Sequence, residues 1–145
     1  MSDDNNKYII SVTGVQEVDG EKDKIEVIVT GDYMIKNGHT YIKYKEYDAD
    51  NPQIALDTVV KVEEDKVSII RMGDKPSRLI LQQGVRHQCH YNTVMGDLMM
   101  GVYTSAIENN LTEKGGDLVA RYQLDFFADL VSDNEFHINV KEKEE

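Results

Sequence analysis

The chain is poor in cysteine and proline, and it has no long apolar run. Its 145 residues include one cysteine, Cys89, and two prolines. A single cysteine excludes an internal disulfide and is typical of a protein from a reducing compartment. The sequence contains neither a run of about 20 apolar residues nor a cationic N-terminal segment followed by an apolar one. We therefore expect a cytoplasmic protein without a membrane partner.

Basic residues are scarce relative to acidic ones. The chain has 16 Lys and Arg against 27 Asp and Glu, a net charge of −11. Such a field repels phosphate backbones, so we expect no nucleic-acid partner, and the acidity itself is common in freely soluble proteins. The length suits one domain, 1–145, with polar ends at 1–6 and 141–145 that we expect to be flexible.

The sequence also lacks the familiar catalytic and metal-binding motifs: a nucleophile elbow, a phosphate-binding glycine loop, HExxH and a CxxC pair. The nearest candidate is the run from His87 to His90. On a strand His87 and Cys89 share a face while His90 points away, so at most two could hold one metal, and Zn²⁺ needs three or four ligands. We expect no metal and no cofactor, and an unreactive Cys89.

The segment from Gln88 to Ile107 is predicted to be the central hairpin, turning at Met95-Gly96-Asp97. Glycine accepts the positive φ that short hairpin turns require. Alternate residues of each arm share one face. On the first arm these are Cys89, Tyr91, Thr93 and Met95, and on the second Leu98, Met100, Val102, Thr104 and Ala106.

A second hairpin is predicted from 24–36 and 39–48. Asn37-Gly38 between them is a strong signal for a two-residue turn. In the first arm the apolar residues alternate with polar ones, as in a sheet with one wet face. The inward set is predicted to be Ile25, Val27, Val29, Gly31, Tyr33 and Ile35, with a bend or bulge at Gly31.

Further strands are predicted at 7–17, 66–73, 78–83, 117–129 and 136–140, with a polar connection at 109–116 and a turn at 132–134. Residues 53–64 fit either a helix, opened by Asn51-Pro52, or a strand. Their β-branched run favours the strand. The total is nine or ten strands with short turns, which is typical of an all-β sandwich or barrel. We predict a single antiparallel meandering β-barrel, because closure removes exposed strand edges.

Two sets of residues could serve ligand binding, although an internal ion pair and core filling are their simpler explanations. Arg71 shares a parity with Val67 and Ile69, which aims it at the core if that face is the inner one. A buried guanidinium needs an acidic partner, the simpler explanation, or a ligand anion. Met95, Met99 and Met100 cluster near the central turn, and methionine serves both cores and adaptable binding surfaces.

The chain resembles the YwiB-like family of bacterial domains of unknown function, over roughly residues 8–140. The segments that carry the resemblance are Gly31–Tyr33 with Asn37-Gly38, Ile69–Gly73, Tyr91–Gly96 with Met100 and Thr104, Tyr122–Leu124, and Phe136–Ile138. In that family the central turn usually reads Thr-Pro-aromatic-Gly, whereas here it is Thr93-Val94-Met95-Gly96. The resemblance implies a calycin-type, lipocalin-like barrel. Calycins hold small ligands inside the barrel, although fold alone does not fix function.

Three functional hypotheses follow. The first is a non-enzymatic barrel that binds a small apolar or amphipathic ligand, with Arg71, Tyr91, Thr93 and Thr104 as candidate ligand-binding residues. The second is a protein–protein interaction module or homodimer that uses an exposed face or edge strand; the chain could then be a monomer or a homodimer. The third is an enzyme that uses His87, Cys89 or His90.

Overall fold

The structure, a computed structural model, describes residues 7–47, 55–73, 76–93, 96–126 and 130–143. Its elements are ten strands: β1 (Tyr8–Val18), β2 (Glu21–Lys36), β3 (His39–Tyr47), β4 (Ala55–Val62), β5 (Lys66–Arg71), β6 (Ser77–Gln82), β7 (Arg86–Thr93), β8 (Gly96–Thr112), β9 (Gly115–Phe126) and β10 (Leu130–Glu142). Within these ranges there is no helix that could span a membrane.

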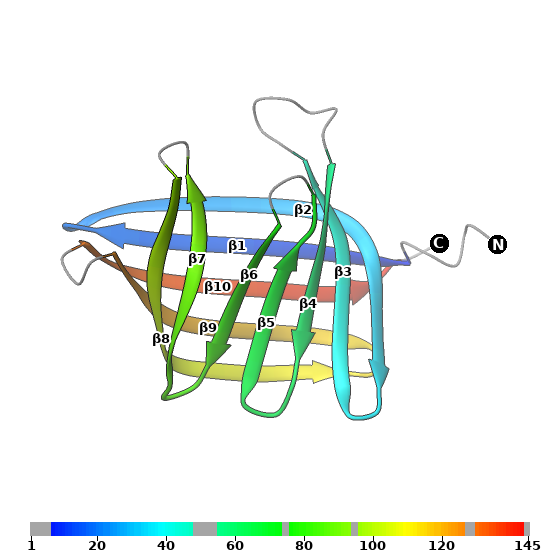
Figure 1. Cartoon of the computed structure of the whole chain (residues 1–145). Helices are drawn as coiled ribbons and strands as arrows, with labels where there is room; N and C mark the ends of the chain where they lie inside the picture. The colour runs from blue at the N-terminus through cyan, green and yellow to red at the C-terminus, as the bar shows by residue number, and fades with distance from the viewer. Residues whose placement is uncertain (1–6, 48–54, 74–75, 94–95, 127–129, 144–145) are drawn as a thin grey trace.

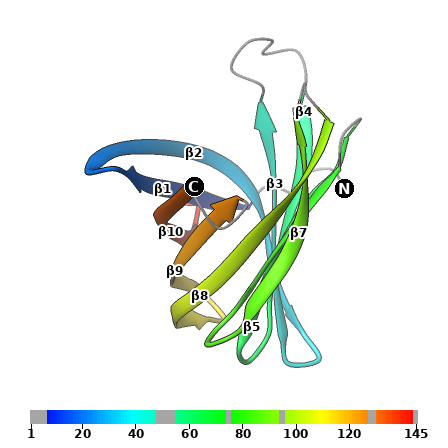
Figure 2. The same cartoon turned by 60° about the vertical axis from the view of Figure 1, so that its left-hand side comes forward.

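All ten strands belong to one antiparallel sheet in the order β6-β5-β4-β3-β2-β1-β10-β9-β8-β7. In Figure 1, β1, β9 and β10 run across the molecule while β3 to β7 run steeply to them. The two longest strands, β2 with 16 residues and β8 with 17, curve from one layer into the other. Figure 2 shows the two layers enclosing the interior from the side. The predicted antiparallel barrel is confirmed.

The barrel is nearly closed, because the end strands of the sheet, β6 and β7, lie next to each other. Within the described residues no ladder of backbone hydrogen bonds joins β6 to β7. The contact near the end of β6 is a side-chain hydrogen bond between Gln82 Oε1 and His87 Nε2 at 2.8 Å. Beyond β6, the Gly84 N–H donates to the Thr104 carbonyl of β8 at 2.8 Å.

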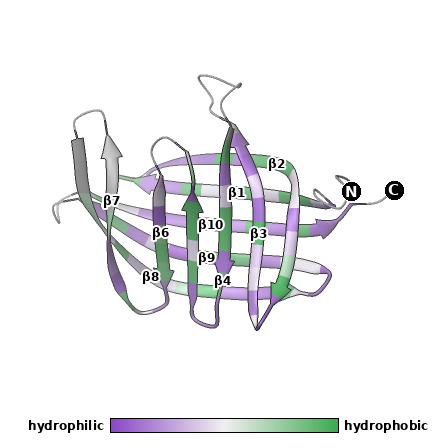
Figure 3. Cartoon of the chain, turned by 45° about the vertical axis from the view of Figure 1, so that its right-hand side comes forward, coloured by the Kyte–Doolittle hydropathy of each residue, from purple (hydrophilic) through white to green (hydrophobic). Residues whose placement is uncertain are grey.

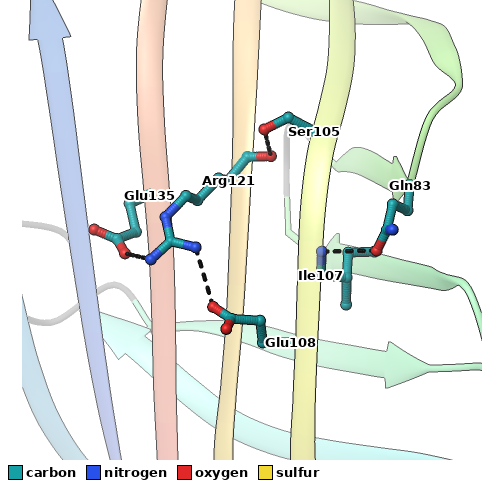
Figure 4. A network of polar contacts seen from close by, with 6 residues as sticks. All are labelled: Gln83, Ser105, Ile107, Glu108, Arg121 and Glu135. Atoms are coloured by element: carbon teal, nitrogen blue, oxygen red, sulfur yellow. Dashed lines mark hydrogen bonds and ion pairs between the residues drawn. The ribbon is translucent and has the colours of Figure 1, made fainter.

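A bulge in β8 lies next to this gap between β6 and β7, and Figure 4 shows the polar contacts around it. The β8–β9 register shifts between Thr104 and Ala106. Past the shift, the Ile107 N–H donates to Gln83 Oε1 at 3.0 Å. The Gln83 side chain therefore accepts a backbone hydrogen bond that a neighbouring strand would otherwise accept. Nearby, Arg121 joins β9 to its neighbours through Glu108 at 3.0 Å and Glu135 at 3.2 Å.

The core lies on the inner face of the sheet, where alternate residues of each strand are apolar (Figure 3). Its fully buried members come from both layers: Ile10, Ile42, Val60, Val67, Leu81, Val102, Leu118, Ala120 and Ile138. The Tyr8 and Tyr33 rings meet edge to face, 5.4 Å apart, where β1 faces β2.

Several expectations about single segments are confirmed. The Asn37-Gly38 turn joins β2 to β3 with positive φ at both residues, and Lys36 faces His39. The ambiguous segment is a strand, β4, over its described part. On β5 the inner face is the one that carries Val67 and Ile69, which resolves the choice of face that the sequence left open.

Other expectations were wrong, mostly because strands continue through polar residues. β8 extends to Thr112 and β10 includes residues 132–134, so the predicted connection at 109–116 shrinks to a tight turn and the predicted turn at 132–134 is absent. Gly96 faces Thr93, which places Gly96 and Asp97 in β8; Val94 and Met95 lie outside the described residues. The bulge removes Ala106 from the inward set.

The C-terminal end is also more ordered than expected. β10 continues to Glu142, and the Lys143 N–H donates to the Lys7 carbonyl at 2.9 Å. Residues 141–143 therefore belong to the barrel, where the sequence suggested a flexible tail.

Candidate functional site

The barrel interior contains a cavity of about 460 Å³ beside the gap between β6 and β7. Its apolar wall consists of Leu79, Met100, Leu124 and Phe126. Its polar lining consists of Gln16, Arg71, Ser77 and Arg78, with Cys89 at the gap. Mostly apolar cavities with a few placed polar groups are the usual form of small-molecule sites.

Arg71 reaches the interior because it ends the inward set of β5. Register places it opposite Thr58 of β4 on one side and Ser77 of β6 on the other. Thr58 in turn faces Tyr44 of β3. Directly opposed residues of neighbouring strands share a face, so these four side chains form one polar row on the inner wall.

The Arg71 guanidinium forms an ion pair with Glu46, which lies two residues beyond Tyr44 on the same face of β3. Arg71 Nε lies 3.2 Å from Glu46 Oε2 and 3.4 Å from Glu46 Oε1. Arginine carries five N–H donors, and this contact uses one of them. Within the described residues, the two terminal nitrogens of Arg71 have no acceptor. The guanidinium can therefore bind a further anion without losing Glu46.

The hydroxyl groups around Arg71 are hydrogen-bond donors at neutral pH. Burial raises the pKa of Tyr44, with the neighbouring Glu46 carboxylate as a further cause. Burial also raises the pKa of Tyr122 on β9, while the Arg71 charge opposes that rise. Tyr44 Oη and Thr58 Oγ1 are buried without a hydrogen bond of good geometry. Unpartnered buried polar groups cost free energy and call for an explanation.

An outer groove meets this cavity at the gap between β6 and β7. The groove, about 400 Å³, is lined on the outside by residues of β5, β6 and β7, including Ile70, Ile80 and Gln88. Arg71, Ser77, Arg78 and Cys89 line both the groove and the interior cavity. The gap therefore forms a side entrance to the barrel, and both arginines lie at it.

Of the four predicted ligand-binding residues, the structure places Arg71 in the cavity lining. Thr104 is also on the inner wall, fully buried with its hydroxyl unpartnered, but it is not part of that lining. Tyr91 and Thr93 belong to β7, and their side chains lie outside the described part of the structure. The structure therefore places Arg71 in the cavity lining and Thr104 elsewhere on the inner wall, and ligand binding by the four residues stays a prediction.

Sequence reasoning missed Glu46, Tyr44 and Arg78. Glu46 and Tyr44 share the parity of Ile42 in a segment that was predicted to be a strand, so the signal was present. Arg78 has the outward parity of β6 and reaches the cavity only because β6 borders the gap. That position follows from barrel closure and has no local sequence signal.

The His87–His90 run does not form a cluster of potential ligands in the described structure. His87 is engaged with Gln82, and Cys89 is buried. The side chain of His90 lies outside the described part. No group of three His, Cys, Asp or Glu side chains is placed to hold a metal within the described residues.

Comparison with known proteins identifies the family. The model of the "Domain of unknown function (DUF1934)" family matches residues 10–138. The chain belongs to the DUF1934 family. The chain is also similar to the "Uncharacterized beta-barrel protein YwiB" of Bacillus subtilis (strain 168), with 28% identity over 116 residues, 79% of each chain. The crystal structure of the ywiB protein from Bacillus subtilis has a TM-score of 0.77 at 23% identity and covers 99% of this chain and 98% of that one.

These matches confirm the YwiB-like resemblance and the β-barrel of this DUF1934 member. The family and both relatives are described as uncharacterised or of unknown function, or by their gene name alone. Function must therefore be argued from the cavity itself.

Proposed function

We propose that this barrel binds a small amphipathic molecule in the cytoplasm, with the apolar body in the interior cavity and an anionic group on Arg71. The observation that carries the proposal is the composition of the cavity lining. A guanidinium occupies one wall, and Leu79, Met100, Leu124 and Phe126 form the other. An apolar body buried against such a wall gains roughly 25 cal/mol per Å².

The charges at the cavity favour an anion. Arg71 and Arg78 supply two positive charges and Glu46 one negative charge, so the entrance carries a local charge of +1 in a chain of net charge −11. Ser77 adds a hydroxyl donor to the lining, and Thr58 and Tyr44 continue the polar row beyond it on the same inner wall. Donors without matching acceptors are complementary to a carboxylate or another single oxyanion.

Binding fits the lining better than catalysis. The nucleophilic groups in the described lining are Ser77 and Cys89. Activating either one requires an adjacent base, and no His, Asp or Glu is among the described lining residues. We expect the protein to hold its ligand without transforming it.

The first test is native mass spectrometry of the protein purified gently from its own host, repeated after denaturation. We expect a reproducible extra mass that disappears on unfolding. Binding would then be measured directly with a fluorescent medium-chain carboxylate and its uncharged amide. The carboxylate should bind more tightly, because a charge-assisted hydrogen bond contributes about 1.5–3 kcal/mol.

Arg71→Ala should weaken carboxylate binding by at least about tenfold while leaving amide binding nearly unchanged. Arg121→Ala is the matched control, since Arg121 carries the same charge on the outer wall and is paired with Glu108 and Glu135. If both variants lost the same carboxylate affinity, the contribution of Arg71 would be one of general charge and not of direct contact with the ligand. An apo mass in the native spectrum together with no binding of either probe would refute the proposal.

A further inference from the structure

One half of β2 has an open edge. β1 pairs with β2 from Glu21 to Gly31, but β3 pairs with β2 only from Gly31 to Lys36. Along residues 21–30 the other side of β2 therefore faces no strand within the described part of the chain, and Figures 1 and 2 show this stretch curving away from β3. An open edge presents a row of backbone N–H and C=O groups that can pair with another strand.

The same stretch exposes large apolar side chains on both of its faces. Ile25 is 68% exposed, Ile28 67% and Val27 39%. Ile25 and Val27 have the inward parity of β2, so the sequence pattern predicted that they would be buried, and that prediction was wrong. They face Gly14 and Val12 of β1, and the barrel wall opens there because β3 has left β2.

Natural edge strands are commonly protected by lysine, proline or a bulge. Lys22 and Lys24 provide such protection only at the start of this edge. Between Ile25 and Thr30, the one charged residue is Glu26. Exposed apolar residues on an unprotected edge indicate that the edge has a partner.

We propose that a second copy of this chain pairs antiparallel with the open edge of β2, with Ile25 facing Ile25 of the other copy. Opposed residues in an antiparallel ladder must point to the same face, so a two-fold ladder must be centred on a residue. Centring it on Asp23, Lys24 or Glu26 would oppose like charges, which is destabilising. Ile25, Val27, Ile28 and Val29 remain as centres, and the last two would pair only residues 26–30 and 28–30 of the open edge.

The length of the edge and its charges select Ile25. That register pairs residues 21–29 with 29–21 and so uses nearly the whole open edge, whereas a ladder centred on Val27 spans only 24–30. It also places Lys24 opposite Glu26 twice, once on each side of the two-fold axis. The stem of Lys22 then lies beside Ile28.

The test is sedimentation velocity of the ligand-free protein from micromolar to millimolar concentration. We expect a reversible dimer. Lys24→Glu should weaken dimerisation about tenfold by placing glutamates opposite each other at two symmetric positions. Glu26→Lys should weaken it similarly, and the double variant K24E/E26K should restore it, because the exchanged charges face each other again.

Lys22→Glu is the matched control, because it makes the same charge change on the same strand while facing Ile28. It should weaken the dimer less than Lys24→Glu does. Circular dichroism and thermal unfolding of each variant would verify that the barrel is intact. A wild type that stays monomeric at all concentrations would overturn the proposal and leave the edge to a different partner. A dimer that Lys24→Glu leaves intact, or that the double variant fails to restore, would overturn the register.

Discussion

At the scale of the residue, Gly31 determines where β3 can join β2. A Cβ at this position would collide with the Lys43 carbonyl oxygen and with Ile10 Cδ1. Gly31 is the first residue of β2 that pairs with β3, opposite Tyr44. The close approach of the two backbones, together with the curvature of β2, explains why a glycine lies in a long strand. The sequence predicted the bend, but the close contact depends on packing.

Gly31→Ala should therefore destabilise the barrel by about 1–3 kcal/mol, because the backbone of β3 must shift to admit the methyl group. The measurement is urea unfolding followed by circular dichroism. Gly14→Ala is the control, since Gly14 is also in a strand and an added Cβ there meets nothing within 4 Å. Gly14→Ala should stabilise the barrel against unfolding by about 0.5–1 kcal/mol. Similar effects from both substitutions would contradict the role given to Gly31.

Arg71 shows what residue patterns can and cannot predict. Its inward direction followed from the parity of Val67 and Ile69, and its acidic partner was expected in kind. The identity of that partner, Glu46, depends on the β3–β4–β5 order, which brings residues 25 positions apart into contact. A pattern within one strand carries no information about such a neighbour.

At the scale of the element, β8 closes the barrel through its bulge. The extra residue turns Ile107 toward the end of β6, where Gln83 accepts its N–H (Figure 4). Bulges commonly occur at barrel rims for this reason. The alternation of β8 runs without a break through Ala106 in the sequence, so no local pattern indicates the shift.

Gln83→Ala should destabilise the protein by about 0.5–1.5 kcal/mol, the usual net effect of one hydrogen bond. Hydrogen exchange of the Ile107 amide should increase in the same variant. Gln123→Ala is the control, because within the described residues the Gln123 side chain bonds the exposed Asp133 carboxylate at 3.0 Å and no other group. This substitution should change stability by less than about 0.5 kcal/mol. An unchanged exchange rate at the Ile107 amide would show that Gln83 does not hold β8 to the end of β6.

The misjudged elements share a physical cause. Residues 109–112 and 132–134 are mostly polar, and local composition favours turns there. In the barrel their backbones pair with neighbouring strands, Leu111 packs against the core and Ser132 is buried, so the ladder overrides local preference. β-strand prediction is least secure where polar residues interrupt the apolar alternation of a strand.

At the scale of the whole molecule, strand count and alternation predicted the barrel, but they could not locate its openings. These depend on which strands end the sheet and on where β3 leaves β2. Two openings result in the described part of the barrel: the side entrance between β6 and β7, and the open edge of β2. They lie on different strands, so ligand entry and self-association can be tested independently.

Cys89 offers a test of the side entrance, because the chain has a single thiol and that thiol lines both the outer groove and the inner cavity. A ligand in the cavity should slow alkylation of Cys89, as measured by intact mass after timed exposure to a maleimide. The expected slowing equals the fraction of protein occupied by the fluorescent carboxylate. Prior alkylation should in turn block binding of that probe, since the adduct fills the shared lining. Denatured protein, which must react fully with or without probe, is the control. A probe that binds tightly and leaves the alkylation rate unchanged would place the ligand elsewhere and contradict entry between β6 and β7.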